Sequence, residues 1–423
     1  MVRYLGRLTP VEEAVEKLRR RLPGGVETLE LPVWEAVGMV VAEDIVLDHD
    51  FPPRPRSAYD GYAVRSEDTP GRLRVVGEAT IGTIVEGLRI GPGEAVYVTT
   101  GAYLPEGADT VVPEEEARVE GDYIVVEKEY PRWRNVDPPG SIARRGQVLV
   151  PAGTVLTAPD VVGLLDVGVA EGVFYRRLRV AIIETGNELF KPTTPGDTKA
   201  RVLRGEVVAT TGDLILWFIV EYMPWVEVID TVLLPDNLDA LTWYIQRLLD
   251  HVDVVLVTGG TGPSEIDLFY RLPEAVGGEL VVRGLYVKGG RPTSALVVGG
   301  KLVLGLSGHP LSALHGMIRL AYPVLAHMGG ASRPPALPVY TAKLAEPVKK
   351  GRPRPVKVTL EVRDGTLWAR PLPGNLQLSS ANVGLALADG IALVEARDYT
   401  VGEEVPVLAF RMPRGYGRPA IMF

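Results

Sequence analysis

The feature that most constrains the fold is an alternation of short apolar runs and helical segments that begins near Leu178. The runs LRVAII, WVEVIDTVLL, VDVVLV and KLVLGL have the length of strands, whereas DNLDALTWYIQRLLD and PLSALHGMIRLAY repeat apolar residues at helical spacing. Such alternation is typical of a parallel sheet that is covered by helices. We therefore predict a three-layer α/β domain over residues 176–329.

The pattern differs on both sides of this domain. Thr9-Pro10-Val11-Glu12 has the form of a capping box and predicts a helix over about 10–22. Short strand-like runs separated by Gly and Pro predict a β-rich inserted domain over 48–139. Period-2 runs around the turn signal Asp364-Gly365 predict a small C-terminal β-barrel over 330–423.

The remaining residues, 1–47 and 140–175, would form a discontinuous N-terminal α/β linker domain. At 423 residues the chain is too long for one core, because single cores stop growing near ~250 to 300 residues. The predicted fold class is thus multidomain, α/β plus β.

Composition excludes several kinds of protein. The chain has no cysteine and only five histidines, so thiolate sites are excluded and a metal would depend on oxygen ligands. A net charge of -8 argues against a nucleic-acid binder. The frequent charges near the N-terminus disfavour a signal peptide, and the most apolar window, Leu214 to Val220, is far shorter than the ~20 residues of a membrane helix. We therefore expect a soluble cytoplasmic protein.

Ligands of open parallel sheets bind beyond the carboxyl ends of the strands. Three predicted strand ends carry unusual sequences: Glu184-Thr185-Gly186-Asn187-Glu188, Thr258-Gly259-Gly260-Thr261-Gly262 continuing to Asp267, and Gly305-Leu306-Ser307-Gly308-His309-Pro310-Leu311-Ser312. Amides and hydroxyls at helix starts suit a phosphate or another oxyanion. Each segment also has an ordinary interpretation: Glu188 would be a solvated acid on a turn, Asp267 an acid in the first turn of a helix, and His309 a histidine on a turn. We assign no catalysis to His309.

Further segments are weak individually. In Lys288-Gly289-Gly290-Arg291-Pro292, two cations flank glycines, which suits a tetrahedral dianion, although two solvated side chains on a turn is the alternative. Ser57 to Val64 with Asp60, Thr99 to Ala102, and Arg144-Arg145-Gly146 have equally ordinary readings. Their order along the chain is what carries information.

In order, the motifs are SAYDGYAV, TTGAYLPEGADTVVPEE, RRG, PAGT, TGNEL, TGGTG with Asp267, KGGRP and GLSGHPLSA. This series resembles the molybdopterin molybdenumtransferases, which include MoeA and the gephyrin E domain, and the resemblance covers essentially the whole chain. It implies an elongated homodimer whose site is shared between the molybdopterin-binding domain of one subunit and the β-rich domain of the other. It also implies a reaction in which molybdate, or tungstate, replaces the adenylate of adenylylated molybdopterin, with Mg²⁺ assisting and AMP leaving.

The resemblance implies roles for particular residues. The catalytic set would be Asp60, Thr100, Glu188, Asp236 and Asp267, with Asp267 also binding the metal. The substrate-binding set would be Gly259, Gly260, Thr261, Lys288, Arg291, Pro292, Ser312, Arg352 and Ser379. Cations, amide-lined turns and a metal suit this chemistry, because both the substrate and the incoming oxyanion are negatively charged.

Four motifs depart from the family pattern. RRGED is replaced by Arg144-Arg145-Gly146-Gln147, the Asp-Thr/Ser-Asn motif by Ala209-Thr210-Thr211, GNP by Gly308-His309-Pro310, and KPGKP by KGGRP. These losses leave open a catalytically weak paralogue that binds molybdopterin or partner proteins without turnover. An adenylyltransferase acting one step earlier is a third reading, which the presence of all four domains disfavours. Absent cysteine, few glutamines and abundant Arg and Pro are typical of a thermophilic source.

Overall fold

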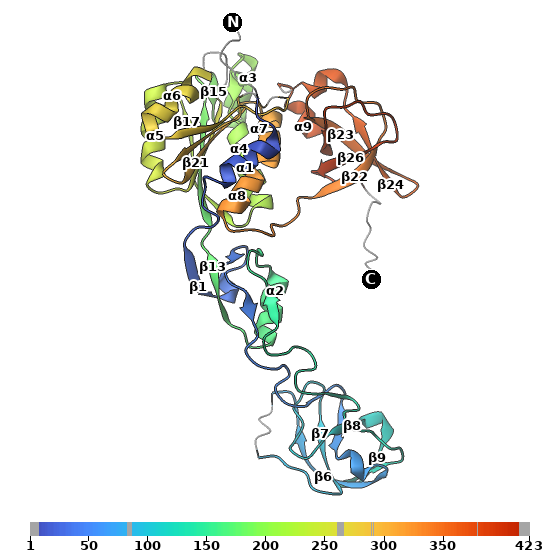
Figure 1. Ribbon diagram of the computed structural model, residues 1–423. Helices are drawn as coiled ribbons and strands as arrows, with labels where there is room; N and C mark the ends of the chain where they lie inside the picture. Colours follow the sequence, from blue (N-terminus) through green and yellow to red (C-terminus); the bar gives the residue numbers. More distant parts are fainter. Residues whose placement is uncertain are drawn as a thin grey trace.

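The molecule is elongated, with three regions arranged along its length (Figure 1). The structure is a computed structural model that describes residues 8–82, 87–259, 266–288, 290, 292–378 and 380–413, without the side chains of 266–270. The α/β region and the C-terminal barrel lie side by side at one end, and the β-rich region lies at the other. No helix in these described ranges is long and apolar enough to cross a membrane.

The α/β region is built on a six-stranded sheet in the order β17-β14-β18-β21-β20-β19. Four neighbouring strands are parallel: β17 (Val226–Leu234), β14 (Leu178–Thr185), β18 (Val254–Gly259) and β21 (Lys301–Leu306). Beyond β21, β20 (Ser294–Val298) pairs antiparallel with β21, and the edge strand β19 (Glu279–Arg283) pairs antiparallel with β20. The parallel core was predicted, whereas the antiparallel edge was not.

Helices cover both faces of this sheet. They are α1 (Val11–Arg19), α4 (Thr211–Tyr222), α5 (Leu238–Leu249), α6 (Ile266–Val276), α7 (Pro310–Gly316) and α8 (Tyr322–Met328), with a π-helical turn over Met317–Ala321. Val180 and Ile182 of β14 belong to the core cluster that contains residues of α4, α7 and α8, whereas Ala181 and Ile183 belong to the cluster with α5. Alternate residues of one strand thus pack on opposite faces, which confirms the three-layer architecture.

The first helix differs from its predicted form. Helix α1 begins after Pro10, and no side chain caps its N-terminus, so the expected capping box at Thr9 is wrong. Thr9 instead forms a parallel bridge with Leu285, in which its N–H donates to the Gly284 carbonyl at 2.9 Å and its carbonyl accepts from Tyr286 at 2.8 Å. This long-range pairing, and not a side-chain cap, fixes the backbone of Thr9 ahead of the helix.

A small module connects the two ends of the molecule (Figure 1). Its sheet has the order β1-β13-β2, formed by β1 (Thr28–Pro32), β13 (Glu171–Tyr175) and β2 (Val40–Val41). Beside it lie a 3-10 turn (Val33–Glu35), the pair β3 (Ile45–Val46) and β12 (Val148–Val150), and helix α2 (Ala158–Asp166), which Thr157 and Asp160 cap reciprocally. Segments far apart in the sequence therefore share one core, which includes Val33, Leu164 and Phe174.

The β-rich region contains a six-stranded sheet in the order β8-β5-β7-β6-β10-β9. Its strands are β5 (Gly61–Val64), β6 (Gly71–Ala79), β7 (Glu94–Val98), β8 (Thr110–Pro113), β9 (Ala117–Glu120) and β10 (Tyr123–Val126). A short pair, β4 (Arg56–Ser57) with β11 (Val136–Asp137), and the 3-10 turns Ser66–Asp68 and Glu114–Glu116 accompany it.

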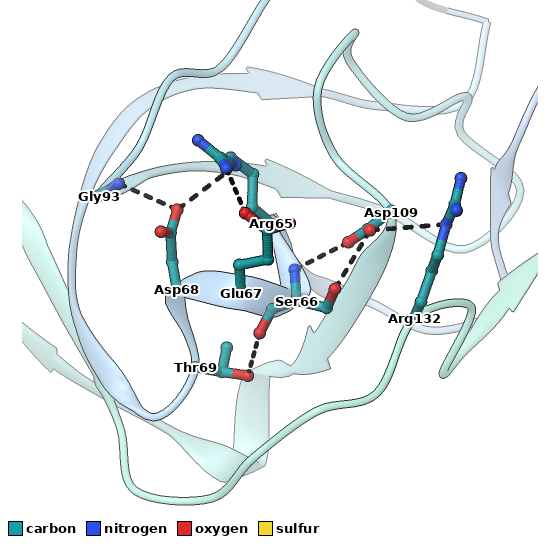
Figure 2. A network of polar contacts seen from close by, with 8 residues as sticks. All are labelled: Arg65, Ser66, Glu67, Asp68, Thr69, Gly93, Asp109 and Arg132. Atoms are coloured by element: carbon teal, nitrogen blue, oxygen red, sulfur yellow. Dashed lines mark hydrogen bonds and ion pairs between the residues drawn. The ribbon is translucent and has the colours of Figure 1, made fainter.

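A polar network fixes the turn after β5 (Figure 2). The Asp109 carboxylate accepts hydrogen bonds from the Ser66 N–H at 2.7 Å and the Ser66 hydroxyl at 3.1 Å. Asp68 accepts from the Gly93 N–H at 3.0 Å, and the Thr69 hydroxyl donates to the Ser66 carbonyl at 2.9 Å. Asp60 precedes the opposite end of the same strand, so the network anchors β5 without taking part in the candidate site.

The C-terminal region is a closed barrel in the order β22-β24-β23-β25-β26. Its elements are β22 (Val339–Leu344), β23 (Arg354–Arg363), β24 (Thr366–Pro371), a 3-10 turn (Gly374–Gln377), α9 (Val383–Leu387), β25 (Gly390–Val394) and β26 (Glu404–Ala409). Asp364 and Gly365, with φ of 48° and 74°, form the predicted two-residue hairpin turn. Ile391 and Leu408 of the barrel lie in the same apolar cluster as α7 and α8, so the barrel packs directly on the α/β region.

Candidate active site at the carboxyl edge of the sheet

The first residues of the candidate site follow the carboxyl ends of two parallel strands, β14 and β17. Asn187 follows β14 and Asp236 follows β17, and two hydrogen bonds join them: Asn187 N–H to Asp236 Oδ2 at 3.2 Å and Asp236 N–H to Asn187 Oδ1 at 3.1 Å. Within the described residues, Asp236 Oδ1 is buried and has no hydrogen-bond partner. A buried acceptor without a partner is costly, so this oxygen marks a place where a ligand donor or cation would bind. Glu188 lies exposed on the same turn as Asn187.

A second carboxylate at this edge was missed by sequence reasoning. Glu184, near the end of β14, is only 3% exposed, and it accepts from the Gly212 N–H at the start of α4 at 2.7 Å and from Lys191 Nζ at 2.6 Å. Lys191 also donates to Asp213 Oδ1 at 3.1 Å. Burial lowers the pKa of Lys191, but the two carboxylates outweigh burial and raise it overall. The acid inside the apolar run LRVAIIET was the available signal.

Two buried threonine hydroxyls, one from α4 and one from β18, donate hydrogen bonds to the turn after β21. Thr211 Oγ1 of α4 donates to the Gly308 carbonyl at 2.7 Å, and Thr258 Oγ1 of β18 donates to the Ser307 carbonyl at 2.9 Å. The Ser307–Gly308 turn is therefore fixed from two sides. It leads directly into α7, where Ser312 lies in the first turn and is 9% exposed.

The glycine loop after β18 is only partly described. Gly259 has φ of +90°, and a Cβ there would overlap the Thr185 carbonyl oxygen, so only glycine fits. Gly260 and Thr261 lie outside the described residues. Asp267 is the second residue of α6, and its side chain is likewise outside the description.

The oxyanion side of the candidate site lies at the same edge. Strand β20 is antiparallel to β21 and its first residue, Ser294, pairs with Gly305, so the loop that precedes β20 reaches the carboxyl end of β21. Lys288 lies in this loop with an exposed side chain, and half-buried Pro292 follows it. Arg291 and Ser379 are not among the described residues.

Contact with the barrel brings a second cation to this loop. The Lys288 N–H donates to the Pro353 carbonyl at 2.8 Å, and the Arg352 guanidinium carbon lies 5.9 Å from the centre of the Tyr286 ring. Lys288 and Arg352, which are 64 positions apart in the sequence, thus flank one contact between the two regions. Two such cations suit an oxyanion.

The remaining predicted residues, Asp60 and Thr100, lie in the β-rich region. Asp60 Oδ1 accepts from the Thr100 N–H at 2.6 Å and from its hydroxyl at 2.8 Å, and these bonds lower the pKa of Asp60. Glu114 and Tyr97, which sequence reasoning did not single out, adjoin them: the Glu114 N–H donates to the Asp60 carbonyl at 3.2 Å, and the Tyr97 hydroxyl donates to Glu114 at 3.0 Å.

Within one chain, these residues are far from the sheet edge. Figure 1 places β7 and β8 at the opposite end of the molecule from β21 and α7. The structure therefore brings Asp236, Ser312 and Lys288 to the carboxyl edge of the sheet, with Arg352 of the barrel beside Lys288, and leaves Asp60 and Thr100 apart.

The chain is a multidomain protein with a candidate site at the carboxyl edge of its α/β sheet. Comparison with known proteins gives its family. Residues 9–168 match the MoeA N-terminal region (domain I and II), and residues 181–327 match the probable molybdopterin binding domain. The solved structure of the molybdopterin biosynthesis MoeA protein from Pyrococcus horikoshii is 30% identical, with a TM-score of 0.77 over 96% of this chain and 100% of that one. The chain belongs to the MoeA family.

Curated relatives share nearly the full length. A molybdopterin molybdenumtransferase from Bacillus subtilis is 28% identical over 426 residues, covering 96% of this chain and 95% of its own. One from Staphylococcus aureus is 26% identical over 409 residues, covering 94% and 95%. The family resemblance expected from the motifs is therefore confirmed.

Proposed function

We propose that this chain is a molybdopterin molybdenumtransferase of molybdenum cofactor biosynthesis. It would insert molybdate, or tungstate, into adenylylated molybdopterin and release AMP in a step that depends on Mg²⁺. The observation that carries the proposal is that Lys288 and Arg352 flank one contact at the carboxyl edge of the sheet, where Gly259 and the Asp236 carboxylate also lie. Cations at this edge suit two anionic reactants.

The residues divide into two sides. On the phosphate side, Gly259, Gly260 and Thr261 would bind the substrate phosphate, because glycine lets backbone amides approach it closely. On the oxyanion side, molybdate would bind to a set that offers cations and hydroxyls: Lys288, Arg291, Pro292, Ser312, Arg352 and Ser379. Glu188, Asp60 and Thr100 would supply further acid and hydroxyl groups for the reaction.

The Mg²⁺ of the proposed reaction would bind to carboxylates at this edge. No group of three or more His, Asp or Glu that could hold a metal occurs among the residues that the structure describes. Magnesium in phosphate-handling sites commonly uses one or two carboxylates together with phosphate oxygens. Asp267 and the unpartnered Oδ1 of Asp236 would provide them, and the bound ion would offset the charge that develops as the phosphoanhydride is cleaved.

The distance of Asp60 and Thr100 from this edge supports a shared site. We propose a homodimer in which the β-rich region of one chain, residues 48–139, faces the α/β region of the other, residues 176–329. The linker module, 1–47 with 140–175, would space these parts, and the barrel, 330–423, would complete the oxyanion side. Composition further supports a cytoplasmic protein from a thermophile.

An assay of AMP release tests the proposal. The protein is incubated with adenylylated molybdopterin, and we expect AMP to appear only when molybdate or tungstate and Mg²⁺ are all present. Removal of Mg²⁺ by a chelator should stop the release, and its return should restore it. Folded protein that binds the pterin but yields no AMP under any of these conditions would contradict transfer.

The replaced acids favour one alternative, a catalytically weak paralogue that binds molybdopterin or partner proteins without turnover. Ala209 and Gln147 stand where the family pattern has acids. In the structure Ala209 is buried, and the Gln147 side-chain oxygen accepts from the Arg144 N–H at 3.3 Å. Asp267→Asn discriminates the two functions. The transferase predicts a large loss of AMP yield, whereas the binding protein predicts tight pterin binding and an unchanged yield.

A further inference from the structure

A lysine is completely buried in the barrel next to the candidate site. Lys357 lies on β23 with 0% of its surface exposed. Its Nζ donates to three backbone carbonyls, those of Leu376 at 2.7 Å, Leu378 at 3.0 Å and Ala381 at 2.8 Å. An ammonium has three N–H donors, so all of them are used.

The buried ammonium of Lys357 is unusual because the acceptors of its three hydrogen bonds are all backbone carbonyls. Within the described part of the chain, Lys357 forms no ion pair with a carboxylate, and burial lowers its pKa. Burying a charge without an opposite charge is expensive, and an apolar side chain of the same length would fill the space without that cost. The ammonium therefore serves the segment that it binds, the described residues 376–378, 380 and 381, which we call the clamped loop.

A second set of bonds fastens the clamped loop to the same residue. Gln377 Oε1 accepts from the Lys357 N–H at 2.9 Å, and Gln377 Nε2 donates to the Lys357 carbonyl at 2.7 Å and to the Leu372 carbonyl at 3.1 Å. Gly384 of α9 packs so closely that a Cβ there would lie 2.9 Å from Lys357 Nζ. Backbone, side chain and helix thus converge on Lys357.

The clamped loop is hydrogen-bonded to β23 and leads into α9, two elements that contact each other, and both reach the α/β region. Leu385, just beyond the loop, packs against the core cluster that contains Leu311 and Leu314 of α7, and β23 itself contacts α7. Ser312 lies in the first turn of that helix. The N-terminal end of β23 adjoins Pro353, whose carbonyl accepts from Lys288.

We propose that Lys357 is a positioning residue for oxyanion binding, which acts by fixing the clamped loop on β23, the barrel strand that contacts α7. Carbonyl oxygens carry partial negative charge and would repel an incoming oxyanion, and the ammonium holds three of them inward. The inference rests on the proposed function, because it takes molybdate or tungstate as the ligand of this side. Lys357 itself is buried and does not touch the oxyanion.

Three variants of the full-length protein test this role. Lys357→Met keeps the length and removes the charge, Lys357→Arg restores cationic donors, and Leu360→Ala removes buried volume from the same strand without touching the clamped loop. The probe is tungstate or molybdate alone, and its dissociation constant is measured by calorimetry beside the melting temperature. The KM for molybdate and the kcat of AMP release are measured in parallel.

We expect Lys357→Met to weaken oxyanion binding by about tenfold or more, a factor equivalent to roughly 1.4 kcal/mol. The KM for molybdate should rise more than kcat falls, and Lys357→Arg should bind within about threefold of the parent, as a restored donor set predicts. Leu360→Ala should lower the melting temperature but leave oxyanion affinity unchanged. Unchanged affinity in Lys357→Met, or equal losses of affinity in Lys357→Met and Leu360→Ala, would overturn the proposal.

Gln377→Leu keeps the inference testable if Lys357→Met does not fold. It removes the second set of bonds and leaves the ammonium, so a smaller loss of oxyanion affinity supports the clamped loop and no loss overturns it. The two proposals also fail separately. A parent protein whose tungstate affinity falls in Lys357→Met, yet which releases no AMP, would refute the transferase while leaving the positioning role in place.

Discussion

Asp60 and Thr100 form a two-bond pair in which one carboxylate oxygen accepts both the backbone N–H, at 2.6 Å, and the hydroxyl, at 2.8 Å, of the same threonine. The bonds to Thr100, the backbone bond first, lower the pKa of Asp60, so the carboxylate is charged at neutral pH. Both side chains are exposed, which means that the pair contributes little to the core. A fixed, charged and exposed acid is what a shared active site would require of this surface.

Loss of this pair should reduce activity without unfolding the protein. We expect Asp60→Asn to lower the kcat of AMP release by about a hundredfold or more, the range typical of acids that act in proton transfer. Thr100→Val keeps the backbone bond and should cost less. Glu78→Gln, which changes another exposed acid of the same region, is the matched control. Equal activity in Asp60→Asn and Glu78→Gln would remove Asp60 from the reaction.

A mixture of two inactive variants tests whether the site is shared. Asp60→Asn and Lys288→Met are co-expressed with different tags, so that random pairing yields mixed dimers. In a two-fold dimer with shared sites, each mixed dimer regains one intact site, and total AMP release should reach about a quarter of the parent value. If purified mixed dimers release no AMP, Asp60 and Lys288 would belong to a site that is formed within one chain.

His315 should make stability depend on pH. Its ring is fully buried, and neither nitrogen has a hydrogen-bond partner among the described residues. Burial, and to a lesser extent the charge of Arg319, lower its pKa to about 3 from 6.5. Below pH 6.5 the unfolded chain therefore binds a proton at His315 that the folded chain does not bind. The contribution of His315 to the free energy of unfolding is complete above pH 6.5 and is lost as the pH falls toward 3.

Replacing this histidine should flatten the pH profile. At pH 5 the unfavourable protonation would cost the parent protein about 2 kcal/mol relative to pH 7, whereas His315→Leu lacks the titrating group. Melting temperatures at pH 7 and pH 5 give the comparison, with His251→Leu, an exposed histidine, as the control. An equal drop in the parent and in His315→Leu would show that other groups set the dependence.

Two glycine substitutions distinguish the cost of backbone strain from the cost of a steric clash. Gly259→Ala and Gly300→Ala both place a side chain at positive φ, +90° and +80°, but only at Gly259 would the new Cβ overlap another atom, the Thr185 carbonyl oxygen. Gly300→Ala should cost about 1 kcal/mol, whereas Gly259→Ala should cost at least about 2 kcal/mol more. Thermal unfolding measures both, and similar melting temperatures would mean that the loop after β18 can move away.

The α/β region was largely predictable because its parallel strands are buried on both faces and so appear as continuous apolar runs. The antiparallel β19 and β20 also contain short apolar runs, LVV and ALVV, but such a run does not reveal the direction of its strand. The capping box at Thr9 failed because a pairing with Leu285, 276 positions away, decides that backbone. Local patterns do not contain such pairings.

The candidate site was predictable residue by residue but not as an arrangement. Lys288 and Ser312 lie in segments that the sequence singled out, whereas Asp236 was expected from the family resemblance alone. Glu184 was singled out only as part of the segment 184–188 and Lys357 not at all, because their contacts depend on Gly212 and on the carbonyls of Leu376, Leu378 and Ala381. The separation of Asp60 from the sheet edge follows from how the linker module is built, which no motif encodes.

The most direct test of the transferase is a single turnover that counts both products. Stoichiometric protein, adenylylated molybdopterin, Mg²⁺ and molybdate are mixed, and AMP and pterin-bound molybdenum are quantified together. We predict that one molybdenum atom appears on the dithiolene for each AMP released, and that omission of molybdate suppresses both. Bound pterin that yields neither product, or AMP without molybdenum on the pterin, would contradict metal insertion by this chain.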